Sequence, residues 1–301
     1  MEDYPKTIME FENKFRSEED CQKYLIRLRW PDGFMCPQCQ HEKAWRTSRG
    51  LFHCTNCDFE TSVTAGTIFH GTRKPLQWWF RAMWYITNQK YGVSALGLQR
   101  ALGLGSYHTA WTWMHKLRRA MVRPGRDRLD GIVEVDETYI GGGKPGKRGR
   151  GAAGKVLVVI AVQLDDKRIG RIRLQRVPDA SGKSLEKAVG DTVALSSIVR
   201  TDGWNGYNRL GTKGFVHEIA RQEAEVGDNL LPKCNIVASL LKRWLLGTHH
   251  GAVQASHLDY YLDEFTFRFN RRTSGSRGKL FFRLVQQAVA IDPVPRKYFV
   301  S

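Results

Sequence analysis

The stretch Ile132-Val-Glu-Val-Asp136-Glu-Thr-Tyr-Ile140 determines how the rest of this chain is interpreted. Its β-branched residues alternate with acidic and polar ones, which is typical of a β-strand. Because successive side chains of a strand point to opposite faces, the two valines should share one face, and Glu134 and Asp136 the other. Three glycines follow and predict a turn. A carboxylate on a rigid strand beside a glycine turn can hold a divalent metal, but it can equally face water.

The composition predicts a globular protein with a polyanionic partner. The 301 residues are enough for one large domain with one or two small ones, and 42% hydrophobic with 26% charged residues is ordinary. The net charge of +17 favours nucleic acid, although a ribosomal or membrane-surface role would give a similar excess. Apolar runs fall short of the roughly 20 residues of a membrane span, and the start resembles no signal peptide. We therefore expect a cytoplasmic protein with no membrane partner.

Four of the six cysteines fall into two CxxC pairs, and these predict a structural zinc site. Both thiolates of such a pair can bind one metal at the tetrahedral angle. We expect a zinc ribbon that depends on Zn²⁺ for stability and binds either nucleic acid or a protein neighbour. Two redox dithiols or a chance cluster are the alternatives. The four expected ligands are Cys36, Cys39, Cys54 and Cys57.

The segment after the ribbon is predicted to be helical. Residues 76–86 are densely aromatic and indicate a helix buried in a core. Two more helices are expected at 93–102 and 106–121, and the Gly103-Leu-Gly105 break between them is consistent with a helix-turn-helix. The outer face of the second helix is basic and should contact DNA phosphates, unless it only meets water. The residues expected on that face are His108, Trp111, His115, Arg118 and Arg119, with Arg118 and Arg119 predicted to bind DNA.

A basic, glycine-rich run at 144–155 follows the strand with Asp136. It has too much glycine and charge to pack, so we expect a flexible loop. Beside an acidic metal site such a loop can hold a nucleic-acid backbone, and the alternative is a disordered solubilising loop. The residues predicted to bind DNA here are Lys144, Lys147, Arg148 and Arg150.

The next segments predict an α/β core of the RNase H-like kind, a mixed sheet with flanking helices. Strands are expected at 155–163, 168–177 and 197–202, and a helix at 184–193. Three strands, a helix and a fourth strand are the order of that fold. The strands ending near Asp136 and Asp202 then lie side by side, and the two carboxylates can share divalent cations.

A helix at 234–246 offers a third group to this site. Asn235, Ser239 and Lys242 have the spacing of one face, while Ile236, Leu240 and Trp244 are expected to form the apolar one. The Asn235 amide oxygen can bind a metal, and Lys242, two turns further on, can grip a phosphate.

Taken together, these motifs resemble insertion-sequence transposases of the DDE superfamily, in the zinc-ribbon group related to Merlin elements. The matching parts are the four-cysteine ribbon, the Asp136 strand with its glycines, Thr201-Asp-Gly-Trp-Asn-Gly-Tyr207, Ser239-Leu-Leu-Lys-Arg243 and residues 257–272. The resemblance implies a DNA transposase that needs Mg²⁺ or Mn²⁺ and performs strand cleavage and strand transfer at terminal inverted repeats. It also implies double-stranded DNA as partner, a homo-oligomer in the active complex and a place at the bacterial nucleoid.

The resemblance assigns roles to single residues as well. Asp136 and Asp202 correspond to metal ligands, and Asn235 stands where most relatives of the superfamily carry Glu. Lys242 matches the family's lysine, and Arg243 beside it is expected to contact DNA. An amide cannot act as a general base, so a silent copy is an alternative. Glu264 is the alternative third carboxylate, while Glu134 is expected to lie behind Asp136, outside direct contact with the metal.

The expected domain plan has five parts. These are an N-terminal helical segment at 1–30, a zinc ribbon at 31–65, a helix-turn-helix-like domain at 66–125, a catalytic domain at 126–290 and a tail at 291–301. A transposase is the leading interpretation. A DNA-binding regulator with a catalytically silent core, or a related nuclease without strand transfer, are the alternatives.

Overall fold

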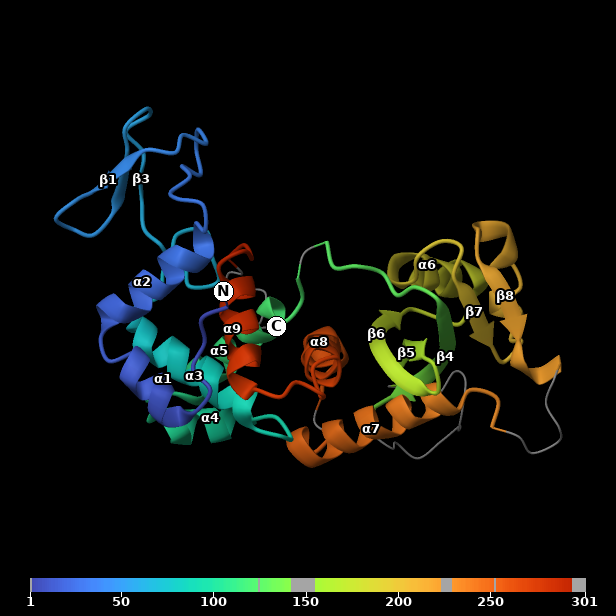
Figure 1. Ribbon diagram of the computed structural model, residues 1–301. Helices are drawn as coiled ribbons and strands as arrows, with labels where there is room; N and C mark the ends of the chain where they lie inside the picture. Colours follow the sequence, from blue (N-terminus) through green and yellow to red (C-terminus); the bar gives the residue numbers. More distant parts are fainter. Residues whose placement is uncertain (1, 124, 142–154, 223–228, 252, 294–301) are drawn as a thin grey trace. The chain divides into compact units, whose positions relative to one another are not determined.

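The computed structural model describes residues 2–123, 125–141, 155–222, 229–251 and 253–293 (Figure 1). Its internal contacts divide the chain into two compact units. The first combines residues 1–124 with residues 274–301, and the second comprises residues 125–273. The second unit therefore ends at Thr273, earlier than the limit at residue 290 that the sequence suggested.

Helices dominate the first unit. They are α1 (Ile8–Lys14), α2 (Glu18–Arg29), α3 (Leu76–Asn88), α4 (Ala95–Leu102), α5 (Tyr107–Ala120) and α9 (Arg277–Ala288). Ser17 begins α2 with a capping box that involves Asp20, a common way to satisfy the free N–H groups of a first turn. Helix α3 is the expected aromatic helix, and most of its side chains are buried.

The C-terminal helix α9 belongs to the first unit because an aromatic cluster holds it there. Phe281 of α9 is fully buried and its ring centre lies 5.4 Å from that of Phe11, 5.7 Å from that of Phe80 and 5.8 Å from that of Trp84. Edge-to-face aromatic contacts at such distances add to the burial of apolar area. In the compact units α9 thus lies with the N-terminal helices, whereas the sequence-based plan placed residues up to 290 in the catalytic domain.

A small antiparallel sheet carries the cysteine pairs. Its strands are β1 (Ala44–Arg46), β2 (Phe52–Cys54) and β3 (Glu60–Thr61), in the order β1-β2-β3. Strands this short bury little apolar surface, so a metal is the natural source of their stability.

Helices α4 and α5 form the expected pair joined by a glycine turn. Gly103 has a left-handed backbone with φ of 63°, and its N–H closes α4 by bonding to the Arg100 and Gln99 carbonyls. The predicted outer face of α5 is partly wrong, because His115 and Arg118 are buried. Arg119 is exposed as predicted. The phase of a helix whose residues are mostly large cannot be set from spacing alone.

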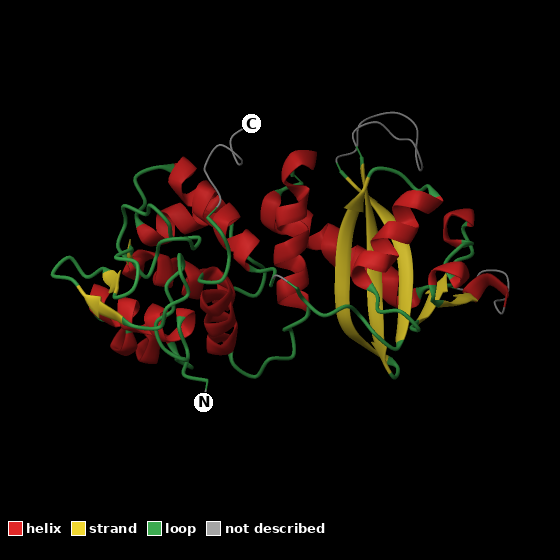
Figure 2. Ribbon diagram, turned by 90° about the horizontal axis from the view of Figure 1, so that it is seen from above, coloured by secondary structure: helices red, strands yellow, loops and turns green. Residues whose placement is uncertain are grey.

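The second unit is built on a five-stranded mixed sheet in the order β6-β5-β4-β7-β8 (Figure 2). The strands are β4 (Ile132–Ile140), β5 (Val156–Asp165), β6 (Arg168–Val177), β7 (Ile198–Thr201) and β8 (Val216–Ile219). β5 runs antiparallel to β4 and β6, whereas β7 is parallel to β4 and to β8. The arrangement is that of an RNase H-like α/β core, as expected, with β8 as a strand that the sequence analysis missed.

Helices cover both faces of this sheet. α6 (Gly182–Thr192) packs on one face, over Val133 and Val135 of β4. α7 (Pro232–His249) and α8 (Leu258–Phe269) pack on the other face, over Ile140 and the alternate residues of β5. Short 3₁₀ helices lie at Asn205–Tyr207, Gly211–Lys213, Ala220–Gln222 and Ala255–His257. Figure 1 shows α6 and α7 on opposite sides of the strands.

The buried face of α7 is shifted by one position along the sequence from the face that was expected. Cys234, Val237 and Leu241 are fully buried against the sheet. Ile236 is 45% exposed, although it was placed in the apolar face. Within the described parts of the chain, none of the helices is long and apolar enough to span a membrane.

The division into units predicts separate effects of two core mutations. Phe281→Ala should destabilise the first unit by about 3–5 kcal/mol, because it leaves a cavity in the aromatic cluster. Phe265→Ala, a buried residue of α8, should destabilise only the second unit. Hydrogen exchange followed by mass spectrometry reports the two units separately. A single catalytic domain reaching residue 290 would instead make both variants loosen the same strands.

Candidate functional site

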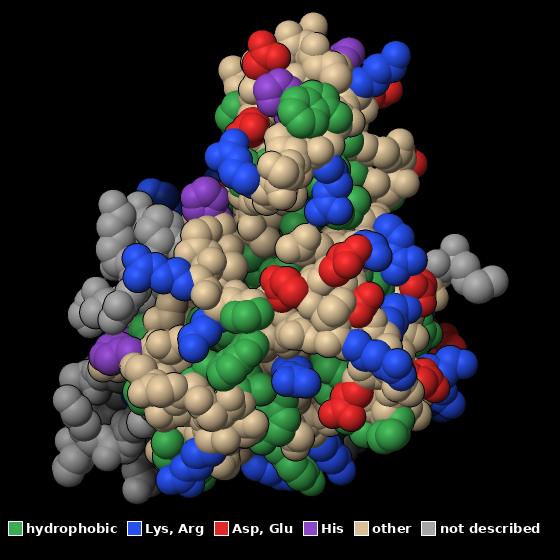
Figure 3. Space-filling model, turned by 90° about the vertical axis from the view of Figure 1, so that its left-hand side faces the viewer, with side chains coloured by type: hydrophobic (Ala, Val, Ile, Leu, Met, Phe, Trp, Pro, Cys, Tyr) green, Lys and Arg blue, Asp and Glu red, His purple; other side chains and the backbone are tan. Residues whose placement is uncertain are grey.

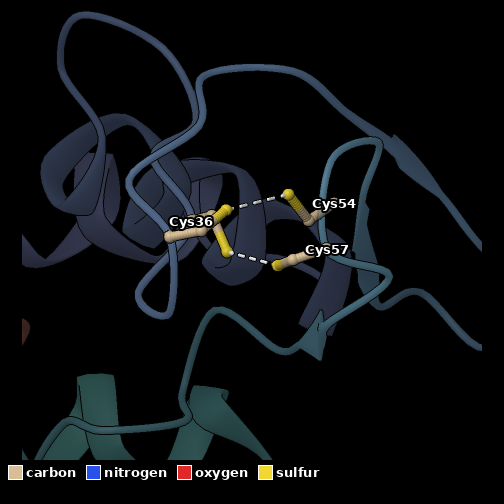
Figure 4. Close-up of side chains that lie close together, drawn as sticks. Cys36, Cys54 and Cys57 are labelled. Carbon is tan, nitrogen blue, oxygen red and sulfur yellow. Dashed lines mark hydrogen bonds between the residues drawn. The ribbon is translucent and has the colours of Figure 1, made fainter.

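Four cysteine sulfurs of the ribbon converge on one point (Figure 4). All four Sγ atoms lie within 4.8 Å of one another, with Cys36 and Cys57 3.7 Å apart and Cys39 and Cys54 3.6 Å apart. A tetrahedral zinc with bonds of about 2.3 Å holds its sulfurs about 3.8 Å apart, and a disulfide needs about 2 Å. The donor set therefore fits a structural zinc, as predicted.

The environment of Cys39 favours the thiolate that a metal binds. Hydrogen bonds from the backbone of His41 and from the Cys57 thiol lower the pKa of Cys39 to about 6. The backbone of Phe59 lowers the pKa of Cys57, but the neighbouring thiols and burial outweigh this effect and raise it to about 12. Without metal the cluster thus carries less than its full charge at neutral pH, and zinc binding should release protons.

A second group of polar side chains surrounds a cavity of about 300 Å³ between β4 and α7. The lining residues are Asp136, Glu137, Thr138, Asn235, Ala238, Ser239 and Lys242. The structure therefore brings Asp136 together with the predicted face of the later helix, including Asn235 and Lys242. Asp136 accepts a hydrogen bond of 2.8 Å at Oδ1 from the N–H of Glu137.

Asp202 comes from the neighbouring parallel strand. The parallel register pairs Ile132 with Ile198 and Glu134 with Arg200, and β7 ends at Thr201, so Asp202 directly follows the strand beside β4. Among the described residues, Asp202 is not part of the cavity lining. Its Oδ1 accepts a hydrogen bond of 2.9 Å from the N–H of Trp204.

The turn after Asp202 requires a glycine. Gly203 has a φ of 87°, and a Cβ at this position would lie 2.7 Å from a side-chain carbon of Ile219. The same turn is tied back to β4, because the Tyr207 hydroxyl donates a 2.9 Å hydrogen bond to Glu137. Burial and the Glu137 carboxylate raise the pKa of Tyr207, so it stays a donor. This link between the two aspartate motifs joins residues 70 positions apart and has no local sequence signal.

Glu134 lies on the same face of β4 as Asp136 and contacts the start of α7. It is 3% exposed, and its Oε2 accepts hydrogen bonds from the N–H groups of Lys233, at 2.9 Å, and Cys234, at 3.2 Å. Burial raises its pKa, while these two backbone donors and Arg200 act in the opposite direction. Glu134 thus accepts hydrogen bonds from the first turn of α7.

The two alternatives for the third ligand are now separated in space. Asn235 lines the cavity, and its Nδ2 donates a 2.6 Å hydrogen bond to Oδ1 of Asn229. Glu264 is completely buried in α8, where it pairs with Arg268 at 2.8 Å. This pairing fits a structural acid and not a metal ligand.

The residues expected to bind DNA are placed unevenly. Arg243 is exposed on α7 directly after Lys242, and Arg119 is exposed on α5, whereas Arg118 is buried. Lys144, Lys147, Arg148 and Arg150 lie outside the described residues. On the face shown in Figure 3, Lys and Arg side chains are interspersed with Asp and Glu.

Comparison with known proteins matches both the ribbon and the sheet. A model of the ISXO2-like transposase domain matches residues 128–270, nearly the whole second unit. A model of the transposase zinc-ribbon domain matches residues 16–59. The chain is also 29% identical over 275 residues to an uncharacterized protein in transposable element ISH50 of Halobacterium salinarum, a match that covers 84% of this chain and 91% of that protein.

The cysteine geometry predicts one zinc per chain, which can be measured by elemental analysis of the purified protein. Cys54→Ser should lose the metal and unfold the ribbon, because one of four ligands is removed. Cys21→Ala, which changes a fully buried cysteine outside the cluster, should keep it. Retention of a full equivalent of zinc by Cys54→Ser would contradict the four-cysteine site.

Proposed function

We propose that this chain, which carries an ISXO2-like transposase domain and a transposase zinc ribbon, cleaves DNA at the terminal inverted repeats of its element and transfers the freed strands to target DNA. The observation that carries this proposal is the cavity in which Asp136 of β4 faces Asn235 and Lys242 of α7. Asp202, at the end of the parallel neighbour strand, completes the set.

The oxygen atoms of this site suit hard divalent cations. Carboxylate and amide oxygens bind Mg²⁺ and Mn²⁺, and magnesium sites usually keep positions open for substrate phosphates. Asp136, Asp202 and Asn235 would hold the metal. When bound, such ions activate the attacking oxygen and stabilise the leaving one in phosphoryl transfer.

Other groups of the site would bind the substrate phosphate and hold the two aspartates in place. Lys242 lines the cavity opposite Asp136 and offers an ammonium to a phosphate oxygen. The Tyr207 hydrogen bond to Glu137 holds the turn after Asp202 against β4, so both aspartates keep one spacing. Asn235 accepts no proton, so the proton of the attacking water or 3′ hydroxyl must leave to another acceptor.

Double-stranded DNA is the partner that fits the charge of the whole chain. A net charge of +17 lets many phosphates be neutralised, with binding that weakens as salt rises. Arg243, the residue after Lys242 on α7, is exposed and would be able to contact DNA. We include in the proposal a multimer that bridges two element ends, at the nucleoid in the cytoplasm of a bacterial cell.

Two alternatives make different predictions from the same site. A silent DNA-binding regulator would bind the repeats without cutting them, and a nuclease would cut without joining. The convergence of Asp136, Asn235 and Lys242 on one open cavity favours chemistry over a relic core. Strand joining alone separates a transposase from a nuclease.

Removal of either aspartate should abolish strand cleavage and joining. Asp136→Asn and Asp202→Asn each keep the shape of the side chain but remove one negative metal ligand. The assay uses purified protein, Mg²⁺ or Mn²⁺, and DNA carrying the terminal repeats. Asp130→Asn is the control, since this carboxylate lies in the same unit with its side chain 68% exposed. Joining that survives both changes would end the catalytic assignment, and binding without cleavage by the unchanged protein would favour the regulator.

The role of Asn235 can be tested separately. Asn235→Ala should slow cleavage at least about tenfold at limiting metal, because the amide oxygen is lost, whereas Asn235→Asp should lower the metal concentration needed. Ile236→Ala changes the next residue, which is 45% exposed, and should leave the rate unchanged. Unaltered activity of Asn235→Ala would remove this residue from the site.

A further inference from the structure

We infer that Glu134 is the positioning residue of the proposed active site: it caps α7 from β4 and so fixes Asn235 relative to Asp136. The inference rests on the proposed function in so far as Asp136 and Asn235 are taken to hold metal. Glu134 itself touches the helix backbone and not the substrate.

Helix α7 begins without a side-chain cap of its own. Its N-cap residue is Leu231, which offers no acceptor, and Pro232 occupies the first turn. The first N–H groups of a helix need acceptors from elsewhere. Glu134 supplies one to Lys233 and to Cys234, at 2.9 Å and 3.2 Å. A carboxylate at this end of a helix also interacts favourably with the helix dipole.

Burial makes these hydrogen bonds necessary for Glu134. A buried carboxylate is costly unless hydrogen bonds and nearby positive charge compensate it. The two backbone donors do so, and Arg200 is its register partner on β7. Loss of Glu134 would leave two N–H groups of α7, that of Cys234 buried and that of Lys233 partly buried, without this acceptor.

The connection from Glu134 to the cavity is short. Glu134 lies two residues before Asp136 on the same face of β4, a distance of about 6.6 Å along a strand. Asn235 directly follows Cys234, whose N–H bonds to Glu134 and whose thiol donates to the Ile160 carbonyl of β5 at 3.6 Å. The strand that carries the first ligand therefore also fixes the turn that carries the third.

The chain contains a matched case that separates position from stability. Helix α3 has Pro75 as N-cap residue, with no side-chain bond, and Glu18 of α2 accepts from the N–H groups of Leu76, at 2.9 Å, and Gln77, at 3.3 Å. Glu18 thus caps a helix from outside as Glu134 does, but in the other unit. Glu18→Gln is therefore the control for Glu134→Gln.

The first experiment compares these two variants in the full-length protein. Glu134→Gln should speed hydrogen exchange at Lys233 and Cys234 and weaken Mn²⁺ binding, measured calorimetrically with Asp136→Asn as blank, by about tenfold. Glu18→Gln should speed exchange at Leu76 and Gln77 and leave Mn²⁺ affinity within about twofold. Glu134→Ala, which removes the acceptor altogether, should weaken Mn²⁺ binding further. Faster exchange in both Glu134 variants with unchanged Mn²⁺ affinity would overturn the inference.

The second experiment asks whether Glu134 acts through Asn235. If it does, Glu134→Gln combined with Asn235→Ala should bind Mn²⁺ no more weakly than Asn235→Ala alone, within about twofold. Additive losses would show that Glu134 acts by another route. If the Mn²⁺ affinities of the unchanged protein and the variants are as expected but the unchanged protein joins no DNA, the proposed function is rejected and this inference stands. No Mn²⁺ binding by the unchanged protein would reject both.

Discussion

The second unit depends on the two-residue alternation of β4 in the middle of its sheet. Val133 and Val135 enter the core beneath α6, whereas Glu134, Asp136 and Thr138 face α7. A slip of one residue would exchange the two sets and bury Asp136 against α6. Antiparallel pairing with β5 along the whole strand and parallel pairing with β7 prevent such a slip. The position of the acidic groups is thus a consequence of sheet register.

Elements with strong local signals could be predicted from the sequence. Alternation identified β4 and set the bounds of β6, and the CxxC spacing identified the sulfur cluster. β8 was not predicted because it has four residues and, among the described strands, pairs with β7 alone, so its sequence carries little pattern. Short edge strands depend on their neighbour more than on their own residues.

The errors arose where non-local packing decides. Around α7, apolar residues form two overlapping stripes, one with Ile236 and one with Val237, and the sheet selects the second. Similarly, the burial of Arg118 depends on the packing around α5, and the place of α9 depends on rings from the start of the chain. Helical spacing reports a face but not the surface that will cover it. The capping by Glu134 is of the same kind, because its partners lie about a hundred residues further along the chain.

An amide in place of a carboxylate shifts the charge balance of the proposed site. Asn235 gives an oxygen without a negative charge, so Asp136 and Asp202 alone must offset the bound cations, beside the positive Lys242. Such a site attracts a divalent cation less strongly than a site with three carboxylates would. Weak electrostatic attraction makes ligand geometry more important, since a misplaced neutral oxygen gains little from long-range attraction. A helix fixed at its first turn by a buried glutamate would supply that geometry, so the proposed roles of Asn235 and Glu134 depend on each other.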